Sequence, residues 1–235
     1  MTHDELLAAG LPVSADAHQR LARYVNALLD ERTRLNLTAA RTPEQIWTAH
    51  ICDSLALLAP LAEYGARRLV DVGSGGGLPG IPLACALLEL QVTLIDATRK
   101  KVDALRRIAT AVGLNNVTCG WGRAEELAHD PAWRESFDAL AARAVSDLPR
   151  LVEYTAGLVR AGGRCWYYKS LAGERDELPA ARGAAEACGL RFVRRIAYTL
   201  PGDLGARVLL EFEKTRPTPA HLPRATGEIA RRPLR

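Results

Sequence analysis

The chain has 235 residues and a formal net charge of +4, with 48% hydrophobic and 25% charged residues. This length suits one α/β domain with a modest extension, and the composition is that of a folded protein rather than a disordered one. No apolar run approaches the ~20 residues of a membrane span, and the N-terminus has acidic residues where a secretion signal has basic ones, so we expect a cytoplasmic protein without a membrane anchor. The five cysteines and five histidines lack the spacing of a disulfide framework or metal site, so the sequence predicts reduced cysteines and no metal.

Residues 1–65 precede the first strand pattern and are expected to be helical. Ser14 is a candidate N-cap for a first helix, because apolar residues recur at helical spacing after it. Thr42-Pro43-Glu44-Gln45 is a capping box that predicts the start of a second helix. Within that helix His50 and Asp53 are three residues apart and therefore share a face. By themselves they indicate a pair on a helix surface more strongly than a functional site.

A glycine-rich stretch follows the first strand pattern. Leu69 to Val72 is an apolar run, and four glycines lie within the next five positions. An apolar, helix-like segment follows them, so the pattern predicts strand, tight loop and helix, as in the nucleotide-binding unit of an α/β sheet. Glycine allows the backbone of such a loop to approach a ligand and to adopt positive φ.

The glycines fit two nucleotide-binding motifs. Counted from Gly75 they match the G-x-G-x-x-G dinucleotide fingerprint, with Asp96 as the acidic residue about 20 positions later, which would make the chain a nicotinamide-dependent oxidoreductase. Counted as Asp71-x-Gly73-x-Gly75-x-Gly77 they match the first motif of S-adenosylmethionine-dependent methyltransferases. We favour the second register because its first glycine directly follows the strand. Asp71 could then contact the cationic amino-acid end of the cofactor.

Candidate strands and helices alternate from Arg68 onward, which predicts a parallel sheet with right-handed crossovers. Helices are expected at Arg99–Val112 and Pro149–Arg160, each ended by glycine. The last two strands are separated only by Pro201 to Gly205, too short for a parallel crossover, so they should form an antiparallel hairpin. The predicted strands are Leu69–Val72, Val92–Asp96, Val117–Gly120, Phe137–Ala142, Arg164–Lys169, Phe192–Leu200 and Ala206–Lys214.

The antiparallel hairpin bears on the choice of cofactor. A seventh strand inserted antiparallel at the end of the sheet marks the methyltransferase version of the Rossmann-like fold, whereas nicotinamide dehydrogenases generally keep their sheets parallel. We therefore predict an α/β fold of the class I S-adenosylmethionine-dependent methyltransferase type in residues 66–214, with an N-terminal helical extension in residues 1–65. The cofactor should lie outside the carboxyl ends of the strands, where Asp96 could accept both ribose hydroxyl protons. Asp96 could also cap the helix that follows.

The excess positive charge lies in the C-terminal tail, residues 215–235. From Lys214 to the end of the chain there are six basic residues and one acidic residue, whereas the rest holds 25 basic and 26 acidic residues. Four prolines interrupt the tail, so we expect a mobile basic arm without a regular helix. Such an arm could contact phosphates through Arg224, Arg231 and Arg232, or it could be a solvated terminus.

Motifs spread over nearly the full length resemble one family. They are Asn36-Leu37-Thr38 with Arg41, His50-x-x-Asp53-Ser54, the run from Asp71 to Pro82, Arg143-Ala144, Lys169, Leu222-Pro223-Arg224 and Arg231-Arg232-Pro233-Leu234. The chain resembles the bacterial methyltransferases, known as RsmG or GidB, that modify N7 of a guanosine in 16S ribosomal RNA. The Gly-Leu-Pro-Gly-Ile-Pro extension of the loop is the most specific part. Two positions depart from the family pattern, since Ala142 replaces a common serine and Ser170 a common glycine.

The resemblance implies an S-adenosylmethionine-dependent enzyme that acts, as a monomer, on 16S rRNA or the small ribosomal subunit. The cofactor contacts that it implies are Gly73, Leu78, Ala124, Glu125 and Arg143. The residues that would face the RNA or shape the mouth of the pocket are Asn36, Arg41, His50, Asp53 and Lys169. N7 of guanine has a lone pair and no proton, so its attack on a methyl group needs no general base. Arg143 is therefore expected to orient the cofactor or target base.

Two alternatives stay open on the sequence. A nicotinamide-dependent oxidoreductase is supported by the Gly75 register alone, and it would melt at a higher temperature with NADH but not with S-adenosylhomocysteine. A non-catalytic RNA-binding protein would bind 16S RNA without affinity for the methyl donor. The intact loop motif and Asp96 argue against the second alternative.

Overall fold

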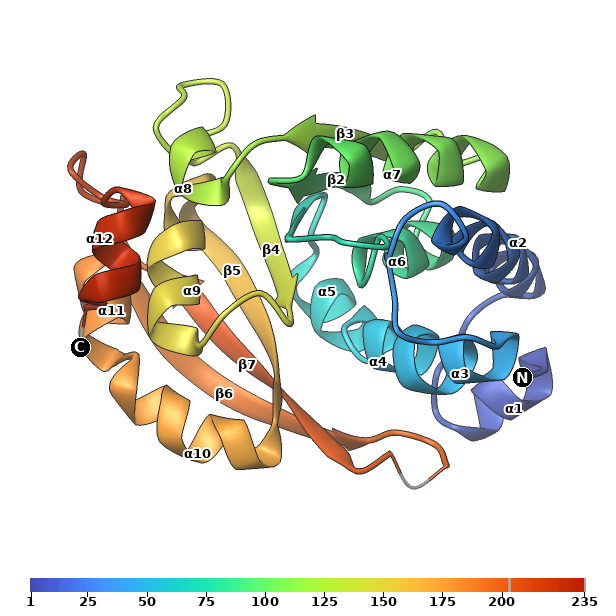
Figure 1. The fold of residues 1–235 in the computed structure, drawn as a ribbon. Helices are drawn as coiled ribbons and strands as arrows, with labels where there is room; N and C mark the ends of the chain where they lie inside the picture. Colours follow the sequence, from blue (N-terminus) through green and yellow to red (C-terminus); the bar gives the residue numbers. More distant parts are fainter. Residues whose placement is uncertain (203, 235) are drawn as a thin grey trace.

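The computed structural model describes residues 1–202 and 204–234, and a seven-stranded sheet runs through its centre (Figure 1). The strands are β1 (Arg68–Val72), β2 (Gln91–Asp96), β3 (Val117–Trp121), β4 (Phe137–Arg143), β5 (Val159–Ser170), β6 (Leu190–Thr199) and β7 (Ala206–Lys214). Their order is β3-β2-β1-β4-β5-β7-β6. β1 to β5 are parallel, whereas β7 is antiparallel to both β5 and β6. The predicted α/β fold with a terminal antiparallel hairpin is confirmed.

Helices cover both faces of the sheet, and several begin where the sequence predicts. Ser14 accepts a hydrogen bond from the backbone of Ala17, and Thr42 accepts one from that of Gln45. No helix in the described part of the chain is long and apolar enough to cross a membrane. The helices are α1 (His3–Ala8), α2 (Ala15–Arg32), α3 (Pro43–Ile46), the π-helix η1 (Trp47–Ile51), α4 (Cys52–Leu55), α5 (Leu58–Tyr64), α6 (Gly80–Ala86), α7 (Arg99–Val112), α8 (Ala124–Leu127), α9 (Leu148–Thr155), the 3-10 helix η2 (Ala156–Leu158), α10 (Leu171–Ala180), α11 (Arg182–Ala187) and α12 (Thr226–Arg231).

Side chains of the strands alternate between two hydrophobic cores. On β5, Trp166 and Tyr168 pack on one face, while Cys165 and Tyr167 pack on the other. The first core contains buried residues of α2 to α7 together with Leu6 of α1, whereas the second contains residues of α8, α9 and α11. The predicted N-terminal helical extension therefore shares its hydrophobic core with one face of the sheet.

The prediction of a helix at Pro149–Arg160 ended by two glycines was wrong at its C-terminal end. Helix α9 ends at Thr155, and β5 begins at Val159 and passes through both glycines. A Cβ on Gly163 would lie 2.9 Å from the backbone oxygen of Asp138 on β4. The pairing register of β4 and β5 shifts at this point. Gly163 therefore permits a close approach of two strands, and the two glycines do not end a helix.

The prediction that the C-terminal tail is mobile and has no regular helix was also wrong. Helix α12 forms between Pro223 and Pro233, which bracket it instead of interrupting it. Leu222 and Ile229 are buried against the rest of the molecule, and this apolar contact gives the segment its place. Helices α8, α10 and α11 were not predicted. Asp203 in the predicted hairpin turn and Arg235 at the end of the tail lie outside the described residues.

Candidate active site

The glycine-rich loop connects β1 to α6 and lies against β2. The backbone nitrogen of Gly73 donates to the oxygen of Ile95 at 2.9 Å. Gly73 and Gly77 have φ values of +70° and +94°, in the region that favours glycine. A Cβ on Gly77 would meet Cδ1 of Ile81 at 2.4 Å. The loop thus needs glycine for its backbone conformation and for its packing on α6.

Asp71 lies behind this loop and is fully buried. Its Oδ2 accepts a hydrogen bond of 2.9 Å from the backbone of Gly80, at the start of α6. Its Oδ1 has no hydrogen-bond partner among the described residues. Burial raises the pKa of the Asp71 carboxyl to about 7. The carboxyl ties α6 to β1, so any influence on a ligand would pass through the loop.

A hollow of about 250 Å³ lies beyond the carboxyl ends of β1 to β4, and we call it the Asp96 hollow. The carboxylate of Asp96 accepts a hydrogen bond from the backbone of Gly75 at 3.1 Å and another from that of Thr98 at 2.8 Å. A carboxylate has about four acceptor positions, so Asp96 can accept two further donors, as a ribose diol requires. The hollow is lined by Val72, Gly73, Ile95, Asp96, Ala97, Gly122, Arg123, Ala124, Glu125, Val145, Ser146 and Tyr154.

Four of the predicted cofactor residues line the Asp96 hollow: Gly73, Asp96, Ala124 and Glu125. Glu125 is buried and accepts a hydrogen bond from the hydroxyl of Thr226 on α12. Leu78, by contrast, is buried in the first core. Of the predicted residues on the glycine loop, Gly73 therefore lines the Asp96 hollow, whereas Leu78 supports the loop from the hydrophobic core.

A second hollow of about 450 Å³ contains Arg143, and we call it the Arg143 hollow. Nη1 of Arg143 lies 2.6 Å from Oδ2 of Asp53, and Nη2 lies 3.4 Å from Nδ1 of His50. The sequence placed Arg143 among the cofactor contacts, whereas the structure joins it to two residues predicted on the RNA side. The hollow is lined by Ala49, His50, Asp53, Arg143, Ala144, Tyr168, Lys169, Ser170 and Arg207.

Further hydrogen bonds hold this group of side chains in place. The Tyr198 hydroxyl donates to Oδ1 of Asp53 at 2.6 Å. Nε2 of His50 lies 2.8 Å from the hydroxyl oxygen of Thr38. Burial and the neighbouring guanidinium lower the pKa of His50 to about 4, so its ring is neutral at neutral pH. It can then accept from Arg143 at Nδ1 and donate to Thr38 at Nε2.

The segment from Arg143 to Ser146 separates the two hollows. Arg143 and Ala144 line one hollow, and Val145 and Ser146 line the other. Nζ of Lys169 bonds the Ser146 backbone oxygen at 2.7 Å, which anchors the segment to β5. A group held in the Asp96 hollow and another held in the Arg143 hollow would meet across these four residues.

The remaining residues predicted to face RNA fall into two regions. Asn36 and Arg41 are exposed in the loop between α2 and α3, whereas Arg231 and Arg232 are exposed at the end of α12. These regions lie at opposite ends of the molecule in Figure 1. Arg224 is bound to the buried carboxylate of Glu153 by two contacts of 2.7 Å, so its guanidinium is already engaged within the protein.

Sequence reasoning missed Tyr198, Ser146 and Tyr154. Tyr198 follows 145 residues after its partner Asp53, and nothing in the local pattern of β6 indicates that contact. Thr38 belongs to the Asn-Leu-Thr motif, so a signal for it was present even though only Asn36 was selected. Long-range pairing, rather than motif spacing, defines this part of the site.

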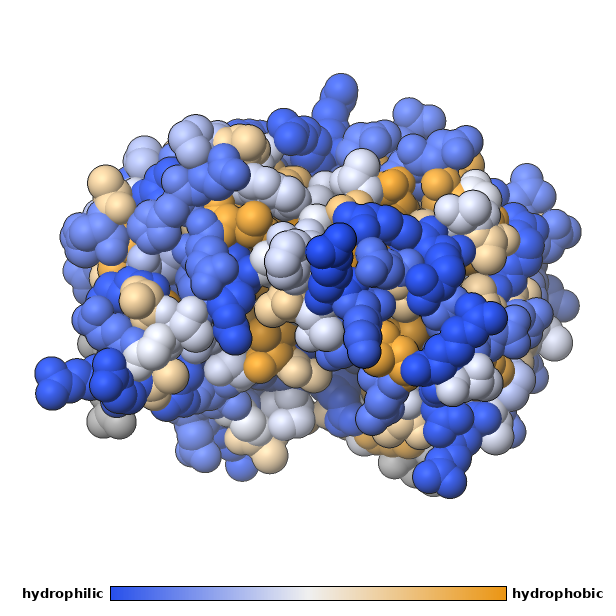
Figure 2. All heavy atoms as spheres, turned by 45° about the horizontal axis from the view of Figure 1, so that its top comes forward, coloured by the Kyte–Doolittle hydropathy of each residue, from blue (hydrophilic) through white to orange (hydrophobic). Residues whose placement is uncertain are grey.

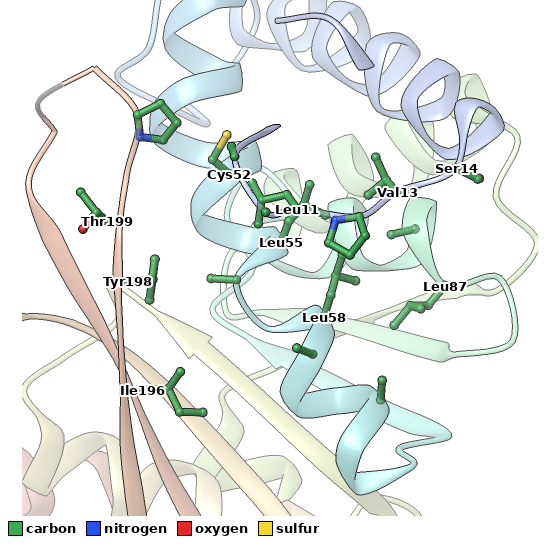
Figure 3. A pocket seen from close by; sticks show the side chains of 18 residues that line it. Leu11, Val13, Ser14, Cys52, Leu55, Leu58, Leu87, Ile196, Tyr198 and Thr199 are labelled. Carbon is green, nitrogen blue, oxygen red and sulfur yellow. The ribbon is translucent and has the colours of Figure 1, made fainter. Parts of the chain in front are cut away.

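A third hollow, of about 510 Å³, is larger but does not have the chemistry of a nucleotide site (Figure 3). Leu11 and Val13 enter it from the turn after α1, Leu55 and Leu58 from α4 and α5, and Ile196 from β6. The glycine loop and Asp96 do not line it. Its mostly apolar lining makes it a gap between packed elements rather than a place for a charged ligand.

Comparisons with known proteins agree with this geometry. Residues 17–195 match the family model GidB, described as rRNA small subunit methyltransferase G. The chain belongs to this family. Two proteins named ribosomal RNA small subunit methyltransferase G are similar to it: one from Moorella thermoacetica, at 36% identity over 98% of each chain, and one from Deinococcus radiodurans, at 41% identity over 96% of this chain and 88% of the relative.

Solved structures with low sequence identity share the fold of this methyltransferase family member. An O-methyltransferase from Bacillus cereus, in complex with SAH, has a TM-score of 0.59 and 19% identity, covering 90% of this chain and 96% of its own. A putative O-methyltransferase from Klebsiella pneumoniae has the same TM-score at 16% identity, covering 91% and 96%. The family predicted from the motifs is confirmed, and a methyltransferase is favoured over an oxidoreductase or a non-catalytic RNA-binding protein.

Proposed function

We propose that this methyltransferase transfers the methyl group of S-adenosylmethionine to N7 of a specific guanosine in 16S rRNA. The observation that carries the proposal is the placement of two hollows on either side of Arg143–Ser146. One hollow has the carboxylate and glycine backbone that suit a nucleoside, and the other has cationic side chains that suit RNA. We further infer that the protein acts as a monomer in the cytoplasm, on rRNA or on the small ribosomal subunit.

The residues of the Asp96 hollow fit S-adenosylmethionine. Asp96 has acceptor capacity left for the ribose hydroxyls, and Gly73 has no side chain to close the hollow. Ala124 and Glu125 follow β3, where the adenine would lie. Asp71, Gly75, Gly77 and Leu78 would hold the loop that surrounds the amino-acid end. The cofactor supplies a methyl group on a positively charged sulfur.

The Arg143 hollow would hold the target guanine. Arg143 or Lys169 can donate to O6 of the base and leave the N7 lone pair free to attack. Positive charge passes to the purine during the transfer, and the carboxylate of Asp53, 2.6 Å from Arg143, offsets the arginine charge next to it. No proton has to leave N7, and the low pKa of His50 accords with a positioning role rather than proton transfer.

RNA phosphates would be contacted outside the hollows. Asn36 and Arg41 lie on the side of α3, and Arg231 and Arg232 lie on α12. The guanidinium of Arg224 is bound to Glu153, so it would not contact RNA directly. Arg224 would contribute only by holding the C-terminal segment in place. Hydrophilic side chains predominate on the face shown in Figure 2, and the apolar residues there form small, separate patches. Such a face suits a charged, hydrated partner.

The proposal is tested by methylation of purified small subunits from cells that lack this protein. Incubation with the protein and labelled donor should label 16S rRNA, and borohydride and aniline treatment, which cleaves RNA at 7-methylguanosine, should then cut at one guanosine. An Asp96→Ala variant serves as the matched control and should leave the rRNA uncut. Labelling without cleavage would place the methyl group on another atom, and absence of labelling would contradict the proposed substrate.

A further inference from the structure

The C-terminal segment, residues 215–234, packs on the part of the chain that forms one wall of the Asp96 hollow. The hydroxyl of Thr226, at the start of α12, donates to Oε1 of Glu125. Glu125 is 6% exposed and lies on α8, a helix of four residues without a side-chain cap. So short a helix has little stability of its own. The direction of the Glu125 carboxylate therefore depends on groups outside α8.

A second contact joins the segment to α9. Nε and Nη2 of Arg224 each lie 2.7 Å from a carboxylate oxygen of Glu153, and the backbone nitrogen of Arg224 donates to the same carboxylate at 3.2 Å. Glu153 is fully buried, so this pair is held without competition from water. The next residue, Tyr154, lines the Asp96 hollow.

Backbone oxygens of the segment bond the loop that follows α8. Nε2 of His129 lies 2.7 Å from the oxygen of Pro223. The guanidinium of Arg134 donates to the oxygen of Thr218 at 2.6 Å and to that of Leu222 at 3.1 Å. The segment is thus fixed to α8, to α9 and to the loop after α8, by polar contacts that a free RNA-binding arm would not make.

We infer that the C-terminal segment is a structural part of the cofactor site, and that Thr226 is a positioning residue that fixes the carboxylate of Glu125. This rests on the proposed function only in taking Glu125 as a contact of S-adenosylmethionine. A hydrogen bond to a buried carboxylate is among the stronger ones in proteins, and the nearby cationic group, Nη1 of Arg123, lies farther away, at 3.8 Å from Oε1 of Glu125. Removing the Thr226 hydroxyl should therefore lower affinity for the cofactor and leave affinity for RNA unchanged.

The test is titration calorimetry with S-adenosylhomocysteine on full-length variants. Thr226→Val keeps the shape of the side chain and removes its hydroxyl, and it should weaken binding about 10-fold, the loss expected for one charge-assisted hydrogen bond. Thr226→Ser should restore affinity. Gly227→Ala is the matched control, because its Cβ would meet nothing within 4 Å. Affinity for small subunits should stay the same in all three variants, and the melting temperature should fall only in Thr226→Val, by a few degrees, because a buried carboxylate loses one hydrogen bond.

A Glu125→Gln variant separates the two ideas being tested. If Glu125→Gln weakens binding and Thr226→Val does not, the positioning role is overturned while the cofactor site stands. If neither variant changes affinity, the assignment of Glu125 to the cofactor fails as well. A Thr226→Val variant that loses melting temperature together with affinity, and that serine does not rescue, would show a merely structural role and overturn the inference.

Discussion

The two hollows of the site are built in different ways. The Asp96 hollow is formed largely by backbone and by residues close to strand ends, and Asp96 is oriented by two main-chain nitrogens. The Arg143 hollow is formed by side chains from distant parts of the sequence, since the partners of Arg143 and Asp53 lie 90 to 145 residues away. The first should therefore be sensitive to backbone conformation, and the second to removal of single polar groups.

The largest effect is expected from Gly73→Val. The substitution introduces backbone strain at a φ of +70°, and its Cβ would lie 2.5 Å from Cγ2 of Val145 in the Asp96 hollow. Strain and overpacking together should cost a few kcal/mol, about 100-fold or more in affinity for S-adenosylhomocysteine by calorimetry. Gly113→Val is the control, because φ there is +81° and its Cβ would meet nothing within 4 Å. Equal affinity for S-adenosylhomocysteine in both variants would show that the backbone at Gly73 does not limit binding in the Asp96 hollow.

Arg143→Lys should reduce turnover about 100-fold, since a displaced reactant or positioning group can cost this much. Lysine keeps the charge but cannot contact both Asp53 and His50 as the planar guanidinium does. Single-turnover methylation of small subunits measures the rate, and calorimetry should show affinity for S-adenosylhomocysteine within about 3-fold of the wild type, a difference well under 1.4 kcal/mol. Full turnover in Arg143→Lys would contradict the assignment of Arg143 to the target base. A loss of cofactor affinity as large as the loss of turnover would contradict it too.

Asp71→Asn tests the support behind the loop through pH. Burial raises the pKa of the Asp71 carboxyl to about 7 in the folded state, from an ordinary value of about 4. The Asp71 carboxyl therefore ionises at a lower pH in the unfolded chain than in the folded protein. As pH rises from about 4 to 7, its ionisation favours the unfolded state and lowers the free energy of unfolding of the wild type. The asparagine variant should gain stability relative to the wild type over that window, by about 3 kcal/mol. Urea unfolding at pH 4.5 and 7.5 measures this, and parallel curves would contradict it; Asp176→Asn, at an exposed position on α10, is the control.

The smallest effect is expected from Tyr198→Phe. The change removes the hydroxyl that donates to Asp53 at 2.6 Å while the apolar ring stays in place. Loss of one hydrogen bond to a carboxylate should lower turnover about 10-fold and leave the melting temperature nearly unchanged. Tyr64→Phe is the control, because its hydroxyl bonds the backbone of Gly162 away from both hollows. An unaffected rate in Tyr198→Phe would show that Arg143 and Asp53 keep their positions without this residue.

Local patterns were sufficient for the framework of the site. The glycine loop, Asp96 at the end of β2 and the terminal hairpin were all predicted, because each depends on a few consecutive residues whose spacing limits the backbone. His50 and Asp53 were expected on one helix face, and both contact Arg143. The predicted end of a helix at Gly162-Gly163 failed because Gly163 is required by the neighbouring strand, which no local pattern reveals.

The amino-acid sequence by itself determined the family, the fold class and the side of the sheet where the cofactor belongs. Only the tertiary structure decided that Tyr198 holds Asp53 and that Arg224 is used by Glu153. It also placed the basic tail, expected to be a free arm, against Glu125, which lines the Asp96 hollow. The reason is that charge and proline content describe what a segment could do in water, whereas its conformation depends on buried partners far away in the chain.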